Sequence, residues 1–129
     1  MNGLIEHGKG LGRTLGFPTA NIRADVESDC ENGVYAGAIW VEFEPLPRPA
    51  MINQGTHPTA PEGKPTIEAY ILDYQGDLYG QRVRVEYLKW LRPERRFESL
   101  DALKAQLARD VEATRAWAAL SGMDWMSAE

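Results

Sequence analysis

Apolar and polar residues alternate over short stretches in the first two thirds of the chain. The stretch QRVRVEY places Val83, Val85 and Tyr87 on one face, because successive side chains of a strand point to opposite sides. Other stretches are rich in β-branched and aromatic residues and are bounded by Gly and Pro, which is typical of strands. We therefore predict six strands, at residues 3–7, 20–22, 33–43, 48–55, 66–73 and 81–87.

The pattern changes after Pro93. Apolar residues then recur at intervals of three and four, which is typical of a helix with one apolar face. Ser99 is the expected N-cap, and Asp101 lies favourably in the first turn. We predict a helix over about residues 100–119, with Leu100, Leu103, Leu107, Val111, Thr114 and Ala118 on its apolar face and Asp101, Lys104, Arg109, Asp110 and Glu112 on its other faces.

The order of these elements predicts the fold class. Strands come first and one long helix comes last, which favours an antiparallel, mainly β sheet that closes or nearly closes on itself, with the helix packed against it. Alternating βαβ units would need helices between the strands. At 129 residues the chain is long enough for one ordinary domain, and we expect a single domain over residues 1–129.

Composition narrows the class of partner. The chain is 43% hydrophobic and 26% charged, and no apolar run approaches the roughly 20 residues of a membrane helix. A single cysteine, Cys30, and a start without a secretory pattern predict a cytoplasmic protein with no membrane partner. A net charge of −5 argues against binding of a long nucleic acid, so a small-molecule partner is expected.

The stretch GKGLGRTLGFPTAN, residues 8–21, is the first candidate site. Its glycines allow backbone N–H groups to approach an anion, and Lys9 and Arg13 add positive charge. It fits neither a Walker loop nor a dinucleotide fingerprint. If the end of the stretch is extended, Thr19 and Asn21 point to the same side and can share a hard cation. Alternatively, both residues form local hydrogen bonds within their own turn.

Six stretches carry a resemblance to a known family. In chain order they are GRTLGFPTAN, NGVYAG, NQGTHPT, TIEAYILD, GDLYG and LRPERRFESLDALKAQLARD. Together they resemble the riboflavin kinase family, in the form found as the C-terminal half of bacterial bifunctional FAD synthetases. The resemblance covers roughly residues 3–115. It implies a six-stranded antiparallel Greek-key β-barrel with a C-terminal α-helix.

The resemblance also implies an activity and a set of site residues. The activity is transfer of the γ-phosphate of ATP to the ribityl 5′-hydroxyl of riboflavin, which gives FMN and ADP. Glu68 matches the catalytic glutamate of the family, and Arg92 matches an arginine on the flavin and phosphate side. Thr19 and Asn21 are expected to bind Mg²⁺. The residues expected to hold the nucleotide are Gly8, Lys9, Gly10, Gly12, Arg13, Gly16, Pro18, Thr19 and Asn21.

Other interpretations of these residues stay open. Glu68 can be simply the outward-facing member of an alternating strand, and Arg92 can form a surface ion pair with Glu94. A catalytically silent flavin- or nucleotide-binding module of the same fold is the alternative function. Bacterial members usually carry an upstream adenylyltransferase domain; this sequence has none, so only the kinase step is expected. Gln54 stands where the family usually has an aliphatic residue.

Overall fold

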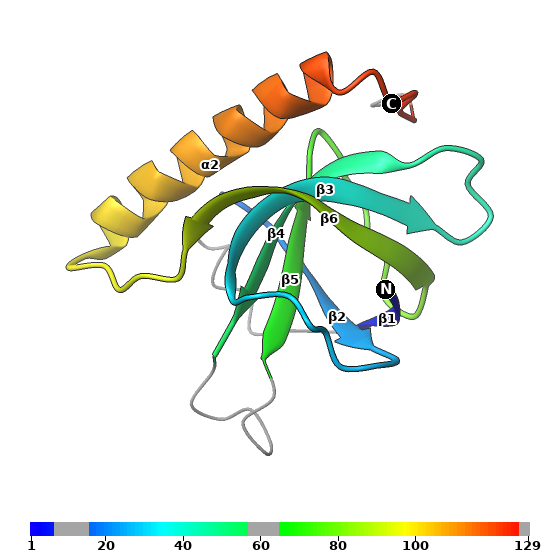
Figure 1. The fold of residues 1–129 in the computed structure, drawn as a ribbon, viewed down its shortest axis with the longest axis horizontal. Coiled ribbons are helices and arrows are strands. Elements are labelled where there is room, and N and C mark those ends of the chain that lie inside the picture. Colours follow the sequence, from blue (N-terminus) through cyan, green and yellow to red (C-terminus); the bar gives the residue numbers. More distant parts are fainter. Residues whose placement is uncertain (7–15, 57–64, 127–129) are drawn as a thin grey trace.

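The computed structural model describes residues 1–6, 16–56 and 65–126. Six strands form a closed barrel in the order β1-β2-β5-β4-β3-β6, in which every pair is antiparallel (Figure 1). One long helix follows the barrel. The elements are β1 (Asn2–Glu6), β2 (Ala20–Ala24), β3 (Gly33–Val41), β4 (Arg48–Gly55), β5 (Thr66–Ile71), β6 (Arg82–Pro93) and α2 (Leu100–Leu120).

The strand connections form a Greek key, as predicted. β3, β4 and β5 pair in sequence order, and β6 then returns to lie beside β3, which is the spatial order that defines the motif. The sequence pattern predicted that β6 ends at Tyr87, but the strand continues to Pro93. Its pairing with β3 shifts register twice, between Val34 and Tyr35 and between Ala36 and Gly37. Each shift breaks the alternation of apolar and polar residues, so the pattern ends while the strand continues.

The barrel interior is filled by side chains from all six strands. Ile39 and Ile52 are fully buried, and Val83 and Val85 point inward as their alternation predicts. Gln54 is a polar residue of this interior, and it is only 1% exposed. Other polar groups satisfy it, because its Nε2 donates to the carbonyl of Cys30 (2.8 Å) and to Oδ1 of Asn32 (3.1 Å), while its Oε1 accepts from the Tyr87 hydroxyl (2.8 Å).

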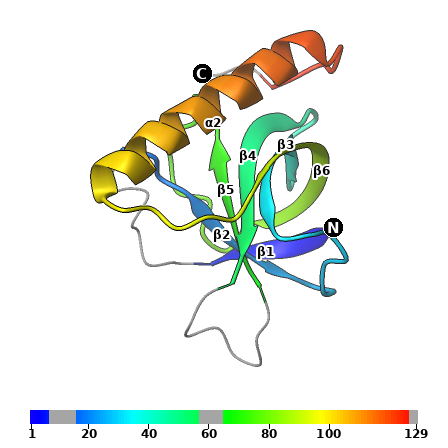
Figure 2. The same cartoon turned by 60° about the vertical axis from the view of Figure 1, so that its left-hand side comes forward.

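Helix α2 lies outside the barrel and crosses its wall (Figures 1 and 2). A second apolar cluster lies between them and contains Val34, Met51, Leu72 and Val111. The predicted N-cap is confirmed, since the hydroxyl of Ser99 accepts from the N–H of Ala102 at 3.0 Å. In the described part of the chain, no helix has the length and apolar character needed to cross a membrane.

Two assignments on the helix faces were wrong. Asp110, predicted on a polar face, is buried, and Leu100, predicted on the apolar face, is 58% exposed. The N-terminal end of α2 projects beyond the barrel (Figure 2), and the buried helix residues begin only at Asp110. Among the described residues, Leu100 therefore lies beyond the barrel wall, whereas Leu107, two turns later, already packs against the second apolar cluster.

Candidate active site

A hydroxyl–carboxylate pair lies on the outer wall of the barrel, where β2 begins. The Thr19 hydroxyl donates a hydrogen bond of 2.8 Å to Oε1 of Glu68 in β5. Ile67 and Ala69, the neighbours of Glu68, belong to the interior cluster, so Glu68 itself points outward and is half-buried. Thr19 therefore binds across to another strand rather than within its own turn, which contradicts the local-turn alternative for this residue.

Strand pairing extends this pair into a row. Asn21 on β2 lies directly opposite Glu68, and Asn53 on β4 lies opposite Glu68 from the other side. Residues directly opposite on antiparallel strands share a face and have Cβ atoms about 5 Å apart. We call Asn21, Glu68 and Asn53 the amide–carboxylate row. Its carboxylate thus has an amide side chain on each flank.

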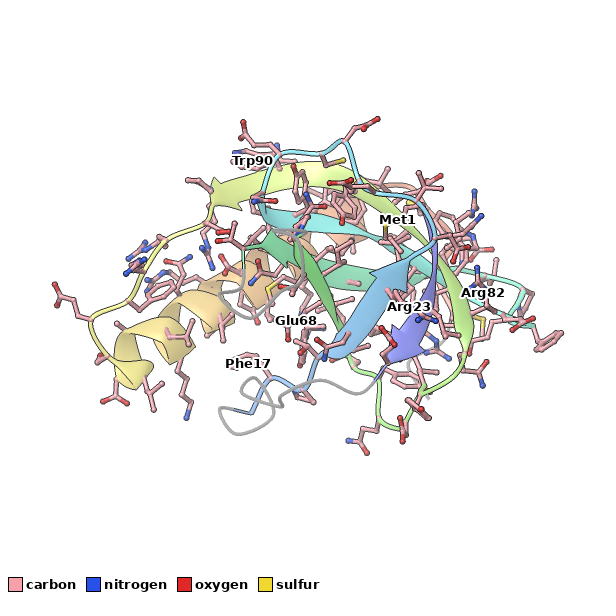
Figure 3. The ribbon with its side chains drawn as sticks, turned by 90° about the horizontal axis from the view of Figure 1, so that it is seen from below. Met1, Phe17, Arg23, Glu68, Arg82 and Trp90 are labelled. Carbon is pink, nitrogen blue, oxygen red and sulfur yellow. The ribbon has the colours of Figure 1, made fainter. Side chains whose placement is uncertain are left out.

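Tyr70 and Phe17 form an apolar shelf that borders the row on the side of the helix. Tyr70, two residues beyond Glu68 on the same strand face, contacts Phe17 edge to face with ring centroids 5.8 Å apart. Both rings pack against the cluster beneath α2. In Figure 3, Glu68 and Phe17 lie on the side of the barrel that carries α2, and Arg82 lies on the opposite side. The site therefore combines hydroxyl, carboxylate and amide groups with the apolar shelf of Tyr70 and Phe17.

Arg92 lies on the same outer wall, at the far end of the strand row. It is opposite Val34, which in turn is opposite Asn53. Its Nε is 3.0 Å from both carboxylate oxygens of Asp110 on α2, and its Nη2 is 2.7 Å from Oδ2. The side chains are 14% and 4% exposed. The sequence alternative, a surface pair with Glu94, is wrong.

Glu94 has a different partner. Its carboxylate accepts from the backbone N–H of Thr56 at 2.7 Å and from the Thr56 hydroxyl at 3.3 Å. A Cβ on Gly55 would come within 2.9 Å of this carboxylate. The end of β4 is thereby tied to the residue that follows β6.

Asp110 is the structural residue that the sequence analysis missed. It orients the Arg92 guanidinium, and the Gln106 amide in turn donates 2.9 Å to Oδ1 of Asp110. A signal was present in the sequence, because Asp110 lies three residues after Leu107 and four before Thr114. Both belong to the predicted apolar face, and this spacing puts side chains on one side of a helix.

The glycine-rich stretch is covered only in part. Gly8, Lys9, Gly10, Gly12 and Arg13 lie outside the described residues. Gly16 is described, with a φ of +88° that glycine adopts readily and other residues rarely do, and Pro18 is exposed. Of the predicted site residues, the structure brings together Thr19, Asn21 and Glu68 and leaves Arg92 three strands away from Glu68.

Fold and site together define the class: a small Greek-key barrel that carries, on its outer wall beside a helix, a carboxylate held by a hydroxyl and flanked by amides. The family model for riboflavin kinase (Flavokinase) matches residues 1–118. The chain belongs to the riboflavin kinase family.

Individual relatives agree with this assignment. The chain is 43% identical over 110 residues to the bifunctional riboflavin kinase/FMN adenylyltransferase of Escherichia coli K12, which covers 85% of this chain but only 35% of the relative. Riboflavin kinase from Trypanosoma brucei superposes with a TM-score of 0.65 at 32% identity, over 89% of this chain and 76% of that one. A Streptococcus pneumoniae structure described as a macrolide-efflux protein superposes with a TM-score of 0.79 at 34% identity, over 90% and 38%.

Proposed function

We propose that this chain is a riboflavin kinase that transfers the γ-phosphate of ATP to the ribityl 5′-hydroxyl of riboflavin, giving FMN and ADP. The observation that carries the proposal, beside family membership, is the 2.8 Å hydrogen bond between Thr19 and Glu68 in register with Asn21. It joins a group that can accept a proton to groups that can hold a metal–phosphate complex.

Glu68 is the proposed general base. A primary alcohol is a poor nucleophile, and a carboxylate within hydrogen-bond reach can orient it and accept its proton as the new bond to phosphorus forms. The 5′-oxygen attacks the γ-phosphorus, the bond from that phosphorus to the β,γ-bridging oxygen breaks, and ADP leaves. The Thr19 O–H that donates to Oε1 keeps the carboxylate as an acceptor and fixes one of its oxygens, so that the other oxygen is available to the substrate.

Thr19 and Asn21 are the residues that would hold Mg²⁺. Their hydroxyl and amide oxygens are hard ligands of the kind this ion prefers, and the hydroxyl of Thr19 retains lone pairs while its proton is donated to Glu68. Thr19 and Asn21 would supply two oxygen ligands to the ion, and phosphate oxygens and water would supply the others. The ion, when bound, supplies charge neutralisation for the transferring phosphoryl group.

The remaining residues have supporting roles in this proposal. Backbone N–H groups of the glycine-rich stretch would bind the phosphates, with Lys9 and Arg13 adding charge. Arg92 would bind negative charge on the flavin phosphate side. Asp110 and the Pro93 carbonyl occupy three of the five N–H donors of its guanidinium, which leaves two. Tyr70 and Phe17 offer an aromatic surface for a planar ring.

The setting of the reaction is also a proposal. The chain spans about a third of the length of the E. coli relative, whose printed name includes a second activity, FMN adenylyl transfer. This supports a kinase unit linked to an adenylyltransferase domain in the full-length protein. We propose the cytoplasm as its compartment, from the single cysteine and the start of the sequence. ATP and riboflavin are its proposed substrates, without a membrane or nucleic-acid partner.

The test is formation of FMN from riboflavin and Mg-ATP, followed by chromatography, with Glu68→Gln as the variant. Glutamine keeps the oxygen that accepts from Thr19 but is no base, so turnover should fall by about 10²–10⁴ while flavin binding persists. Glu86→Gln, a half-buried strand glutamate on β6, is the matched control. A folded wild-type protein that binds riboflavin but makes no FMN refutes the kinase proposal and favours the silent module. Near-normal turnover of Glu68→Gln removes Glu68 as the base.

A further inference from the structure

Asn53 is the third member of the amide–carboxylate row, beside Asn21 and Glu68. It lies on β4 directly opposite Glu68, and Asn21 lies opposite Glu68 on the other flank. Its neighbours Ile52 and Gln54 are buried in the barrel, with exposed fractions of 0% and 1%, whereas Asn53 is half-buried and faces the outer wall. The Cβ atom of Asn53 therefore lies about 5 Å from the Cβ atom of Glu68, the proposed base.

The two flanks of Glu68 are chemically different. Thr19 and Asn21, the oxygen pair proposed to hold the metal and its phosphates, are both on the β2 side. In-line transfer places the attacking hydroxyl opposite the leaving group, with the phosphorus between them. If the leaving group lies with the metal on the β2 side, the acceptor alcohol approaches Glu68 from the opposite side, which is the side of β4 and Asn53.

The chemistry of the Asn53 side chain suits a polyol. A primary amide offers two N–H donors and one carbonyl acceptor, so it can bind a hydroxyl group in either sense. In the described part of the chain this amide makes no hydrogen bond of its own, and its partial exposure leaves it accessible. Beyond it in the same row comes Val34, which is buried and apolar, so Asn53 is the last hydrogen-bonding side chain before Arg92.

We infer that Asn53 binds the polyol chain of the phosphoryl acceptor, through a hydroxyl next to the one that Glu68 deprotonates. This inference rests on the proposed function for the identity of the acceptor. It makes Asn53 a substrate-binding residue that distinguishes flavins with a hydroxylated side chain from flavins without one. The flavin ring would be held elsewhere, on the apolar shelf of Phe17 and Tyr70.

The experiment compares riboflavin with lumiflavin, which has the same ring system but a methyl group instead of the ribityl chain. Binding of each flavin is measured by fluorescence titration for the wild-type protein and for Asn53→Ala, Asn53→Ser and Asn2→Ala. Asn2 is an exposed asparagine on β1 and is the matched control. Loss of one hydrogen bond should weaken riboflavin binding to Asn53→Ala by about tenfold, with a smaller loss for Asn53→Ser. Lumiflavin binding should not change.

The outcomes separate this inference from the proposed function. Equal weakening of both flavins, or unchanged riboflavin binding in Asn53→Ala, overturns the role of Asn53 even if the wild-type protein makes FMN. Selective loss of riboflavin binding supports it even if the wild-type protein makes no FMN, in which case only the kinase proposal fails. In steady-state assays, Asn53→Ala should raise the KM for riboflavin about tenfold and leave the KM for ATP unchanged; a raised KM for ATP instead contradicts the inference.

Discussion

Replacing Asp110 with asparagine would leave the Arg92 guanidinium on the barrel wall without its counter-charge. The pair is bidentate, with an Nη2–Oδ2 distance of 2.7 Å, and its side chains are 14% and 4% exposed. Removal of one partner of a buried ion pair costs about 3–5 kcal/mol, because the other charge stays desolvated. The free energy of unfolding of a small domain is about 5–15 kcal/mol in total, so Asp110→Asn should remove a large fraction of it.

Urea unfolding followed by circular dichroism measures this loss. With a dependence on urea of about 2 kcal/mol per molar, the midpoint of Asp110→Asn should fall by about 2 M. Asp73→Asn is the matched control, because Asp73 also pairs with an α2 arginine, Arg115, through two hydrogen bonds of 2.7 and 3.2 Å. Those side chains are 50% and 44% exposed, and an exposed pair contributes at most about 1 kcal/mol.

A double variant tests the Arg92–Asp110 pair from the other direction. Arg92→Met combined with Asp110→Leu removes both charges and fills the space with apolar groups, so it should be more stable than Asp110→Asn alone. The predicted loss is wrong if Asp110→Asn lowers the free energy of unfolding by no more than Asp73→Asn does. It is also wrong if the double variant loses more free energy of unfolding than Arg92→Met and Asp110→Leu lose together when each is measured singly.

Two further predictions concern pH and metal. Burial raises the pKa of the Tyr87 hydroxyl well above its usual range; the phenol therefore ionises more readily in the unfolded chain, and the free energy of unfolding should fall as pH rises above about 10. Urea midpoints at pH 9 and pH 11 should differ less for Tyr87→Phe than for the wild-type protein, and an equal difference contradicts the prediction. Asn21→Ala should raise the Mg²⁺ concentration needed for half-maximal FMN formation several-fold; an unchanged Mg²⁺ titration would remove Asn21 from the site.

Much of the fold followed from local patterns. The inward face of Val83 and Val85 could be predicted, as could the helix cap at Ser99. Each depends on residues within a few positions of one another. The residue at which β6 ends could not be predicted from the sequence. Its two register shifts against β3 interrupt the alternation, and a register shift is a property of two strands together.

The candidate site divides in the same way. Glu68, Thr19 and Asn21 were identified from sequence because they lie in distinctive stretches. The hydrogen bond between Thr19 and Glu68 joins residues 49 positions apart, and no local pattern predicts it. Asn53 begins one of the family-like stretches, NQGTHPT, but no role was predicted for it, because its place opposite Glu68 is set by strand pairing.

The sequence by itself determined the class of elements, their order and the chemical types available, since periodicity and capping act within one segment. Only the tertiary structure decided which of these groups meet. Closing the barrel placed Glu68 between Asn21 and Asn53, and packing of α2 turned Asp110 from an expected surface charge into the buried partner of Arg92. Both results depend on strand register and helix docking, which are fixed by the burial of apolar surface over the whole domain rather than by any single stretch of chain.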